Sequence, residues 1–104
     1  MSEQLTHFVD GKRAALDSTR TSPIFNPSTG RQSGEVLLAS KADAERVIAS
    51  SQAAFEHWSA FSPLKRARVL FNYKALLEAH ADELARLIAQ EHGKVLSDAR
   101  GELT

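Results

Sequence analysis

The sequence predicts an α/β fold in which short N-terminal β-strands precede an antiparallel pair or trio of α-helices. Two observations support this prediction. Before residue 41, turn-forming residues recur at short intervals, which favours brief strands. After it, apolar residues recur at spacings of three and four, which is typical of helices with one buried face. We therefore expect strands within residues 7–39, helices within residues 41–92 and a further helix over residues 96–104.

The early strands are defined by the turns between them. Residues 7–16 predict a hairpin, because the Asp10-Gly11 pair tolerates the positive φ angles of a two-residue turn. Ser22–Phe25 is expected to be extended, since proline disfavours the helical region for the residue before it. Asn26–Gly30 predicts a turn in which proline sets φ and glycine completes the turn. Residues 34–39 are apolar enough for a buried strand.

The first helix begins with a capping pattern, in which Ser40 is followed three residues later by Asp43. Because residues 59–62 form a short link to the next helical stretch, we expect the two helices to pack antiparallel. The expected inner face of the first helix consists of Ala44, Val47, Ile48, Ser51, Ala54, Phe55 and Trp58.

Residues 62–94 carry the longest helical pattern. Ser62 suits the N-cap, Pro63 suits the first helical position, and Gly93 can take the left-handed conformation that ends a helix. About thirty residues is long for one globular helix, so we expect a break near His80, with His80 or Asp82 capping the second part. The expected buried stripe consists of Leu70, Tyr73, Leu77, Ala81, Leu84 and Ile88.

The last residues begin another apolar stripe, at Leu96, Ala99 and Leu103, without a final cap. We therefore expect the chain to end inside an element. The early strands are short and have few partners, and isolated hairpins are marginal in water. Both observations predict the N-terminal portion of a larger protein.

Composition excludes several classes of function. The 104 residues include 13 Lys or Arg and 13 Asp or Glu, so the formal net charge is zero. Such a chain has no overall attraction for nucleic acid or anionic membranes. No apolar run is long enough to span a bilayer, and the first residues do not resemble a signal peptide. We therefore expect a cytoplasmic protein with no nucleic-acid partner and no membrane partner.

No pattern predicts a catalytic, cofactor-binding or metal-binding residue. Without cysteine, the chain offers no thiol nucleophile and no thiolate ligand. His80 and Asp82 could resemble a base and its orienting residue, but helix capping explains them more simply. The histidines lack the spacing of a helical metal site, so surface or capping roles are expected for His7, His57, His80 and His92.

The remaining motifs also favour structural roles. The glycines match neither a dinucleotide-binding turn nor a P-loop. A basic patch is followed closely by acidic residues, which favours a solvated face over a phosphate site. The patch consists of Lys65, Arg66, Arg68 and Lys74. The aromatic residues Phe55, Trp58, Phe61 and Phe71 fit core packing better than a ligand cage.

Several segments, taken in order, resemble the N-terminal region of the aldehyde dehydrogenase superfamily. Residues 8–12 look like its opening strand and turn, and Phe25–Gly30 matches its Asn-Pro-x-Thr-Gly turn, the most specific of these signals. Glu91–Lys94 matches its Glu-x-Gly-Lys segment, and Ala99–Glu102 matches the helix that follows. The first helices are matched by Ala54, Phe55, Trp58, Arg66, Arg68, Leu70, Leu77, Leu84 and Ala85.

Within the superfamily, residues 77–80, 91–94 and 98–102 look most like the coenzyme A-acylating branch, the methylmalonate-semialdehyde dehydrogenases. The resemblance implies that the complete protein uses NAD and coenzyme A to convert malonate or methylmalonate semialdehyde to acetyl- or propanoyl-coenzyme A, with loss of carbon dioxide. That chemistry needs a thiol nucleophile, which this chain lacks. The chain is then an architectural part of the NAD-binding domain, with no cofactor of its own.

Three alternatives remain open. A non-acylating aldehyde dehydrogenase would share this region and finish by hydrolysis. A stand-alone helical interaction module would use its apolar faces to bind a partner or a second copy of itself. A nucleic-acid module using residues 65–74 is the least favoured. The expected partner is therefore the remainder of the enzyme or another copy of the chain.

Overall fold

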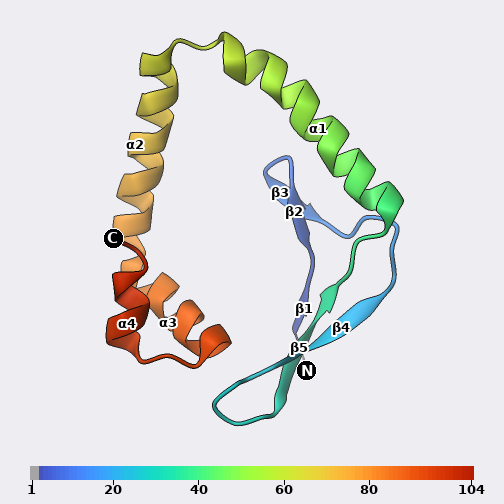
Figure 1. The fold of residues 1–104 in the computed structure, drawn as a ribbon, viewed down its shortest axis with the longest axis vertical. Coiled ribbons are helices and arrows are strands. Elements are labelled where there is room, and N and C mark those ends of the chain that lie inside the picture. Colours follow the sequence, from blue (N-terminus) through green and yellow to red (C-terminus); the bar gives the residue numbers. More distant parts are fainter. Residues whose placement is uncertain (1–2) are drawn as a thin grey trace. The chain divides into compact units, whose positions relative to one another are not determined.

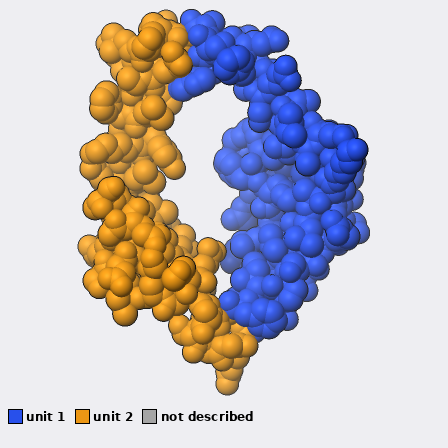
Figure 2. All heavy atoms as spheres, viewed as in Figure 1, with its two compact units in different colours: residues 1–25, 32–60 blue, residues 26–31, 61–104 orange. Residues whose placement is uncertain are grey.

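The computed structural model describes residues 3–104, with five strands followed by four helices in this part of the chain (Figure 1). The predicted α/β class is confirmed. The chain divides into two compact units, which Figure 2 colours separately. The first comprises the residues up to Phe25 together with Gln32–Ala60. The second comprises Asn26–Arg31 together with Phe61–Thr104.

In the first unit, β5 (Gln32–Leu37) is the central strand of a three-stranded sheet. β4 (Thr21–Phe25) pairs with it in antiparallel orientation, and β1 (Glu3–Leu5) pairs with its other edge in parallel orientation. β4 and β5 were predicted, whereas β1 was not, because three residues carry no periodic signal. Leu37 is the buried side chain of β5, with 8% of its surface exposed.

Gly34 explains how β1 can approach β5. It lies opposite Glu3 in the parallel register. A Cβ added at Gly34 would stand only 2.4 Å from the carbonyl oxygen of Glu3. A residue without a side chain is therefore needed at this point of the sheet.

β2 (His7–Val9) and β3 (Lys12–Ala14) form the predicted hairpin. Both turn residues have positive φ, 54° at Asp10 and 74° at Gly11, as a two-residue hairpin turn requires. β3 ends before the predicted limit at residue 16. The reason is that Leu16 also has a positive φ, 58°, which turns the chain out of the extended conformation.

α1 (Lys41–Ala60) completes the first unit, but its predicted inner face is not buried. Ile48 and Phe55 each expose 64% of their surface. The predicted antiparallel packing against the next helix is not confirmed, because the two helices belong to different compact units. The aromatic residues expected in the core are also exposed, namely Phe55, Trp58, Phe61 and Phe71.

In the second unit, the long helical stretch consists of α2 (Pro63–Ala79) and α3 (Ala81–His92), broken at His80 as predicted. The hydroxyl of Ser62 caps α2 by accepting a hydrogen bond from the Lys65 N–H at 3.2 Å. Gly93 ends α3 with a φ of 85°, the left-handed conformation predicted for it.

The predicted stripe on α2 and α3 is partly buried, and only in its second half. Leu70 and Tyr73 are exposed, whereas the later members, Leu77, Ala81, Leu84 and Ile88, are half-buried. α3 contacts α4 (Leu96–Gly101), and each of these helices carries one buried alanine, Ala85 or Ala99. α4 ends at Gly101, before the predicted limit at residue 104.

Candidate functional site

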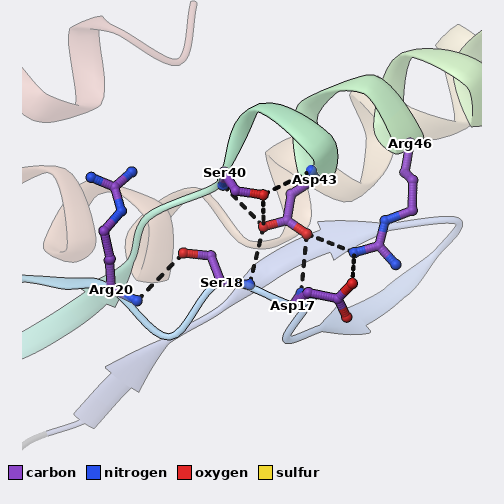
Figure 3. Close-up of polar contacts among 6 residues, drawn as sticks. All are labelled: Asp17, Ser18, Arg20, Ser40, Asp43 and Arg46. Atoms are coloured by element: carbon purple, nitrogen blue, oxygen red, sulfur yellow. Dashed lines mark hydrogen bonds and ion pairs between the residues drawn. The ribbon is translucent and has the colours of Figure 1, made fainter.

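Asp43 lies at the centre of a polar cluster in the first unit (Figure 3). The residue is fully buried. Its carboxylate accepts hydrogen bonds from the backbone N–H groups of Asp17 at 3.0 Å and Ser18 at 3.1 Å. It also accepts from the N–H of Ser40 at 2.9 Å, from the Ser40 hydroxyl at 2.8 Å, and from Nη2 of Arg46 at 2.6 Å. These donors compensate for the burial of a charged group.

Part of this cluster is the predicted capping box. The N–H of Asp43 donates to Oγ of Ser40 at 3.1 Å, while the N–H of Ser40 donates to the Asp43 carboxylate. Each residue therefore satisfies a backbone donor of the other at the start of α1. The prediction from the spacing of these two residues is confirmed.

The donors determine the charge state of the cluster. The N–H groups of Ser40 and Asp17, helped by Arg46, hold the pKa of the Asp43 carboxyl well below its ordinary value of 3.8. Hydrogen bonding to Asp43 and the nearby charge of Asp17 raise the pKa of the Arg46 guanidinium. A permanently ionised carboxylate whose two oxygens are already engaged is a poor proton acceptor. The cluster therefore supports a structural role, joining the loop after β3 to α1.

Backbone strain next to the cluster fits this role. Leu16 has a positive φ, which is unusual for a bulky side chain. It immediately precedes the two residues whose N–H groups bond to Asp43, so those bonds offset the strain. A second link joins the hairpin to α1, because the Ser50 hydroxyl of α1 donates to the Asp10 carboxylate of the hairpin turn at 2.6 Å.

The two segments that carry the sequence resemblance most specifically meet in the second unit. In the predicted turn, the side-chain oxygen of Asn26 accepts the N–H of Ser28 at 2.9 Å, and its carbonyl accepts the N–H of Gly30 at 2.8 Å. A Cβ added at Gly93, just after α3, would lie 3.1 Å from Cγ of Pro27. The turn and the end of α3 are therefore in direct contact. Residues far apart in the sequence form one packed corner.

His80 and Asp82 do not form the pair of base and orienting residue that their spacing allowed. Nδ1 of His80 lies 3.2 Å from a carboxylate oxygen of Glu83, and Asp82 pairs with Arg100 of α4. More than half of each of these side chains is exposed, so the pairs are solvated and weak. His80 occupies the capping position of α3, but its side chain makes no capping hydrogen bond. The predicted break and the predicted capping position at His80 are confirmed, with the His80 carbonyl accepting the N–H of Leu84 at 3.0 Å.

The other three histidines differ in their exposure. His57 and His92 are exposed, as expected. His7 is half-buried, and its Nε2 has no hydrogen-bond partner among the described residues. Within residues 3–104, no group of three or more His, Cys, Asp or Glu side chains could hold a metal ion.

The basic patch on α2 is divided between separate contacts. Lys74 pairs with Glu78 one turn along the helix, and Nζ of Lys65 lies 5.9 Å from the centre of the Phe61 ring. Arg66 is half-buried rather than solvated. These contacts favour the helix-surface interpretation over a phosphate site. No helix in the described part of the chain is long and apolar enough to cross a bilayer.

Sequence reasoning missed the wider role of Asp43. Its capping partner is local, but Asp17 and Ser18 lie 26 and 25 residues away. A periodic pattern cannot indicate contacts over that distance. The sequence did contain a signal for one further partner of Asp43. Arg46 lies one helical turn after it, and a cation at that spacing can form an ion pair with the acid.

The fold and its contacts define a small α/β scaffold in which the polar groups mainly bond to one another.

Residues 15–104 match the model of the aldehyde dehydrogenase family. Malonate-semialdehyde dehydrogenase of Pseudomonas aeruginosa is 42% identical over 99 residues, which cover 95% of this chain and 20% of that protein. The malonate-semialdehyde dehydrogenase of Bacillus pumilus is 38% identical over 101 residues, covering 97% and 21% of the two chains.

Solved structures give the same result. Methylmalonate-semialdehyde dehydrogenase from Oceanimonas doudoroffii superposes with a TM-score of 0.92 and 46% identity, covering 99% of this chain and 21% of that chain. A Sinorhizobium meliloti protein described as a methylmalonate-semialdehyde dehydrogenase, complexed with NAD, gives a TM-score of 0.94 and 46% identity, covering 98% and 21%. The chain belongs to the aldehyde dehydrogenase family. It spans about a fifth of the length of these relatives.

Proposed function

We propose that this chain is the N-terminal segment of the NAD-binding domain of a coenzyme A-acylating malonate- or methylmalonate-semialdehyde dehydrogenase. The main support is the 46% identity to two structures described as methylmalonate-semialdehyde dehydrogenases. Identity is 34% to a succinate-semialdehyde dehydrogenase and 26% to a benzaldehyde dehydrogenase. The sequence is therefore closer to the enzymes named for methylmalonate semialdehyde than to these two relatives, while the fold is common to all of them.

The complete enzyme would oxidise the semialdehyde with NAD, release carbon dioxide and transfer the acyl group to coenzyme A. A thiol nucleophile is required to hold the acyl group as a thioester before transfer. This chain contains no cysteine, so the nucleophile would come from the rest of the polypeptide. NAD and coenzyme A would bind there as well. We place the enzyme in the cytoplasm, and we expect its N-terminal segment to have no nucleic-acid partner.

The segment's own contribution is architectural. The Asp43 cluster fixes the start of α1, and the contact between Pro27 and Gly93 fixes the end of α3. We expect the chain alone to oxidise no aldehyde. We also expect it to bind NAD no more tightly than roughly 0.1 mM, which calorimetry can measure.

One assay tests the proposed reaction. The complete enzyme is supplied with methylmalonate semialdehyde and NAD, with and without coenzyme A, and the product is identified by mass. Propanoyl-coenzyme A supports the proposal, and malonate semialdehyde should give acetyl-coenzyme A in a parallel reaction. Free acid formed at the same rate without coenzyme A would instead assign a non-acylating dehydrogenase. The absence of NADH with every aldehyde would exclude both.

The non-acylating alternative rests on the shared fold. The succinate-semialdehyde dehydrogenase superposes with a TM-score of 0.86 over 92% of this chain. The same scaffold thus occurs in enzymes named for different aldehydes. The acyl acceptor would be determined by residues outside this segment, which is why the product assay, rather than the fold, separates the two functions.

A further inference from the structure

The tip of the β2–β3 hairpin carries the chain's single Asp-Gly pair. Asp10 and Gly11 are both exposed, and a Cβ added at Gly11 would meet no atom within 4 Å. Because glycine has no side chain, little hinders the approach of another group to its nitrogen. An aspartate in this setting can react with the main-chain nitrogen of the residue that follows it.

The reaction rearranges the backbone without a cofactor. The Gly11 nitrogen attacks Cγ of the Asp10 carboxyl group, and the new N–C bond closes a five-membered succinimide ring. The nitrogen's proton and the carboxyl hydroxyl leave together as one water molecule. A second water molecule then opens the ring. Addition at Cγ restores aspartate, whereas addition at the main-chain carbonyl carbon breaks the original peptide bond and leaves the chain joined through Cγ as isoaspartate.

The folded turn opposes ring closure. Asp10 has a φ of 54°, and a non-glycine residue with such a φ has a ψ of about +30 to +60°. In an L-residue this ψ places Cβ and the next nitrogen on opposite sides of the Cα–C bond, but the ring requires them on the same side. Asp10 must therefore rotate about that bond before it reacts. The pairing of Val9 with Lys12, directly beside the turn, resists the rotation.

A contact with α1 restrains the Asp10 side chain as well. The hydroxyl of Ser50 donates a hydrogen bond to Oδ1 of Asp10 at 2.6 Å. Both residues belong to the first compact unit. The carboxyl group that would have to swing towards Gly11 is thus held against the helix.

Asp17-Ser18 provides an internal comparison. The Ser18 N–H, which carries the nitrogen that would attack Asp17, donates to the buried carboxylate of Asp43 at 3.1 Å. That nitrogen is engaged by a fully buried group, and the serine side chain hinders it further. The Asp10-Gly11 pair lacks both kinds of protection and depends on its turn and on Ser50.

We infer that Asp10-Gly11 is a site of spontaneous isoaspartate formation, and that the contact of Ser50 with Asp10 keeps it unreactive until the turn is released from α1. Isoaspartate adds one carbon to the main chain, so the modified turn loses its two-residue geometry. It also loses the Cγ carboxylate that Ser50 binds, which makes the release permanent. The inference is independent of the proposed function, because neither residue is assigned to catalysis.

Three variants test the role of Ser50. Ser50→Ala removes the hydroxyl donor, and Ser50→Thr keeps one. Ser51→Ala is the matched control, because the Ser51 hydroxyl donates to the Val47 carbonyl within α1 at 3.0 Å and not to the hairpin. Each folded chain is incubated for weeks at neutral pH in water labelled with heavy oxygen. Every ring opening then incorporates one labelled oxygen atom.

The sequence allows the two aspartates to be followed separately. Trypsin releases residues 1–12, in which Asp10 is the only aspartate, and residues 14–20, in which Asp17 is the only one. Mass spectrometry measures the labelled oxygen in each peptide. A protease that cleaves before aspartate, but not before isoaspartate, identifies the product.

We expect Ser50→Ala to raise the rate of labelling at Asp10 by about 2- to 10-fold, which corresponds to the loss of one ordinary hydrogen bond. Ser50→Thr and Ser51→Ala should react at the rate of the unchanged chain, and labelling at Asp17 should be the same in all four proteins. An equal or slower rate at Asp10 in Ser50→Ala would overturn the inference.

A urea series on the unchanged chain tests the same point without a variant, in case Ser50→Ala fails to fold. Local release requires less free energy than unfolding of the whole unit, so the rate at Asp10 should rise at lower urea concentrations than those that change the fluorescence of Trp58. A rise that only accompanies the fluorescence change would overturn the gating by α1. The absence of isoaspartate at position 10 even in concentrated urea would overturn the site itself.

Discussion

Replacing Gly34 with alanine tests how closely β1 and β5 pack. The new Cβ would stand 2.4 Å from the Glu3 carbonyl oxygen. That oxygen belongs to the backbone, so it cannot rotate away as the end of a flexible side chain could. Ordinary van der Waals contact requires β1 to retreat by roughly 1 Å, which disrupts the hydrogen bonds of a three-residue strand. The φ of Gly34 lies outside the region that favours glycine, so the cost is steric.

We expect Gly34→Ala to destabilise the first unit by about 1–3 kcal/mol, the usual cost of overpacking. Trp58 is the only tryptophan and lies in this unit, so its fluorescence during urea unfolding follows the relevant transition. Hydrogen exchange of the amides at the junction of β1 and β5 should also become faster. Gly101→Ala is the control, because no atom lies within 4 Å of its added Cβ. If Gly34→Ala unfolds at the same urea concentration as the unchanged chain and exchange at the junction of β1 and β5 is unchanged, the proposed steric conflict is wrong.

Three further predictions concern the caps, the turn and the buried acid. Because the pKa of Asp43 is lower in the folded chain than in the unfolded one, its contribution to stability is complete above its ordinary pKa of 3.8 and is lost as pH falls below it. Asp43→Asn should therefore flatten the dependence of the urea midpoint on pH between about pH 5 and pH 2; an unchanged slope would contradict this. Ser62→Ala should destabilise α2 by about 0.5–2 kcal/mol and accelerate hydrogen exchange of the Lys65 amide, because that N–H loses its acceptor. If the cap contributes nothing, exchange of this amide will be unaffected. Gly93→Ala should cost about 1–2 kcal/mol in backbone strain, as Gly30→Ala does, plus a steric term against Pro27 that Gly30→Ala lacks; equal circular-dichroism melting temperatures for the two variants would exclude that extra term.

Local features of the fold could be predicted from the sequence because their causes are local. The cap at Ser62, the break at His80 and the left-handed end at Gly93 depend on residues within one or two turns. The Asp10-Gly11 hairpin depends on which residues tolerate positive φ. Such preferences act on the backbone whatever surrounds it, so the structure confirms them.

Packing could not be predicted in the same way, because it depends on what lies opposite each face. The apolar spacing on α1 indicates correctly that one face is suited to burial, but Ile48 and Phe55 are exposed in this chain. A short link between α1 and α2 was therefore a poor guide to their contact. The same limit applies to Asp43, whose partners Asp17 and Ser18 are joined to it only by the folded structure.

The division of the chain into units has a consequence for its synthesis and for proteolysis. Asn26–Arg31 belongs to the second unit although both of its neighbouring strands belong to the first. During synthesis, the ribosome has added every residue of the first unit once it reaches Ala60. The packed corner between the Asn26–Arg31 turn and the end of α3 can form only after Gly93 has been added. A single cut after Ala60 therefore releases an intact first unit that still carries the turn, and a set of helices that has lost it. No single cleavage of the backbone separates the two units whole.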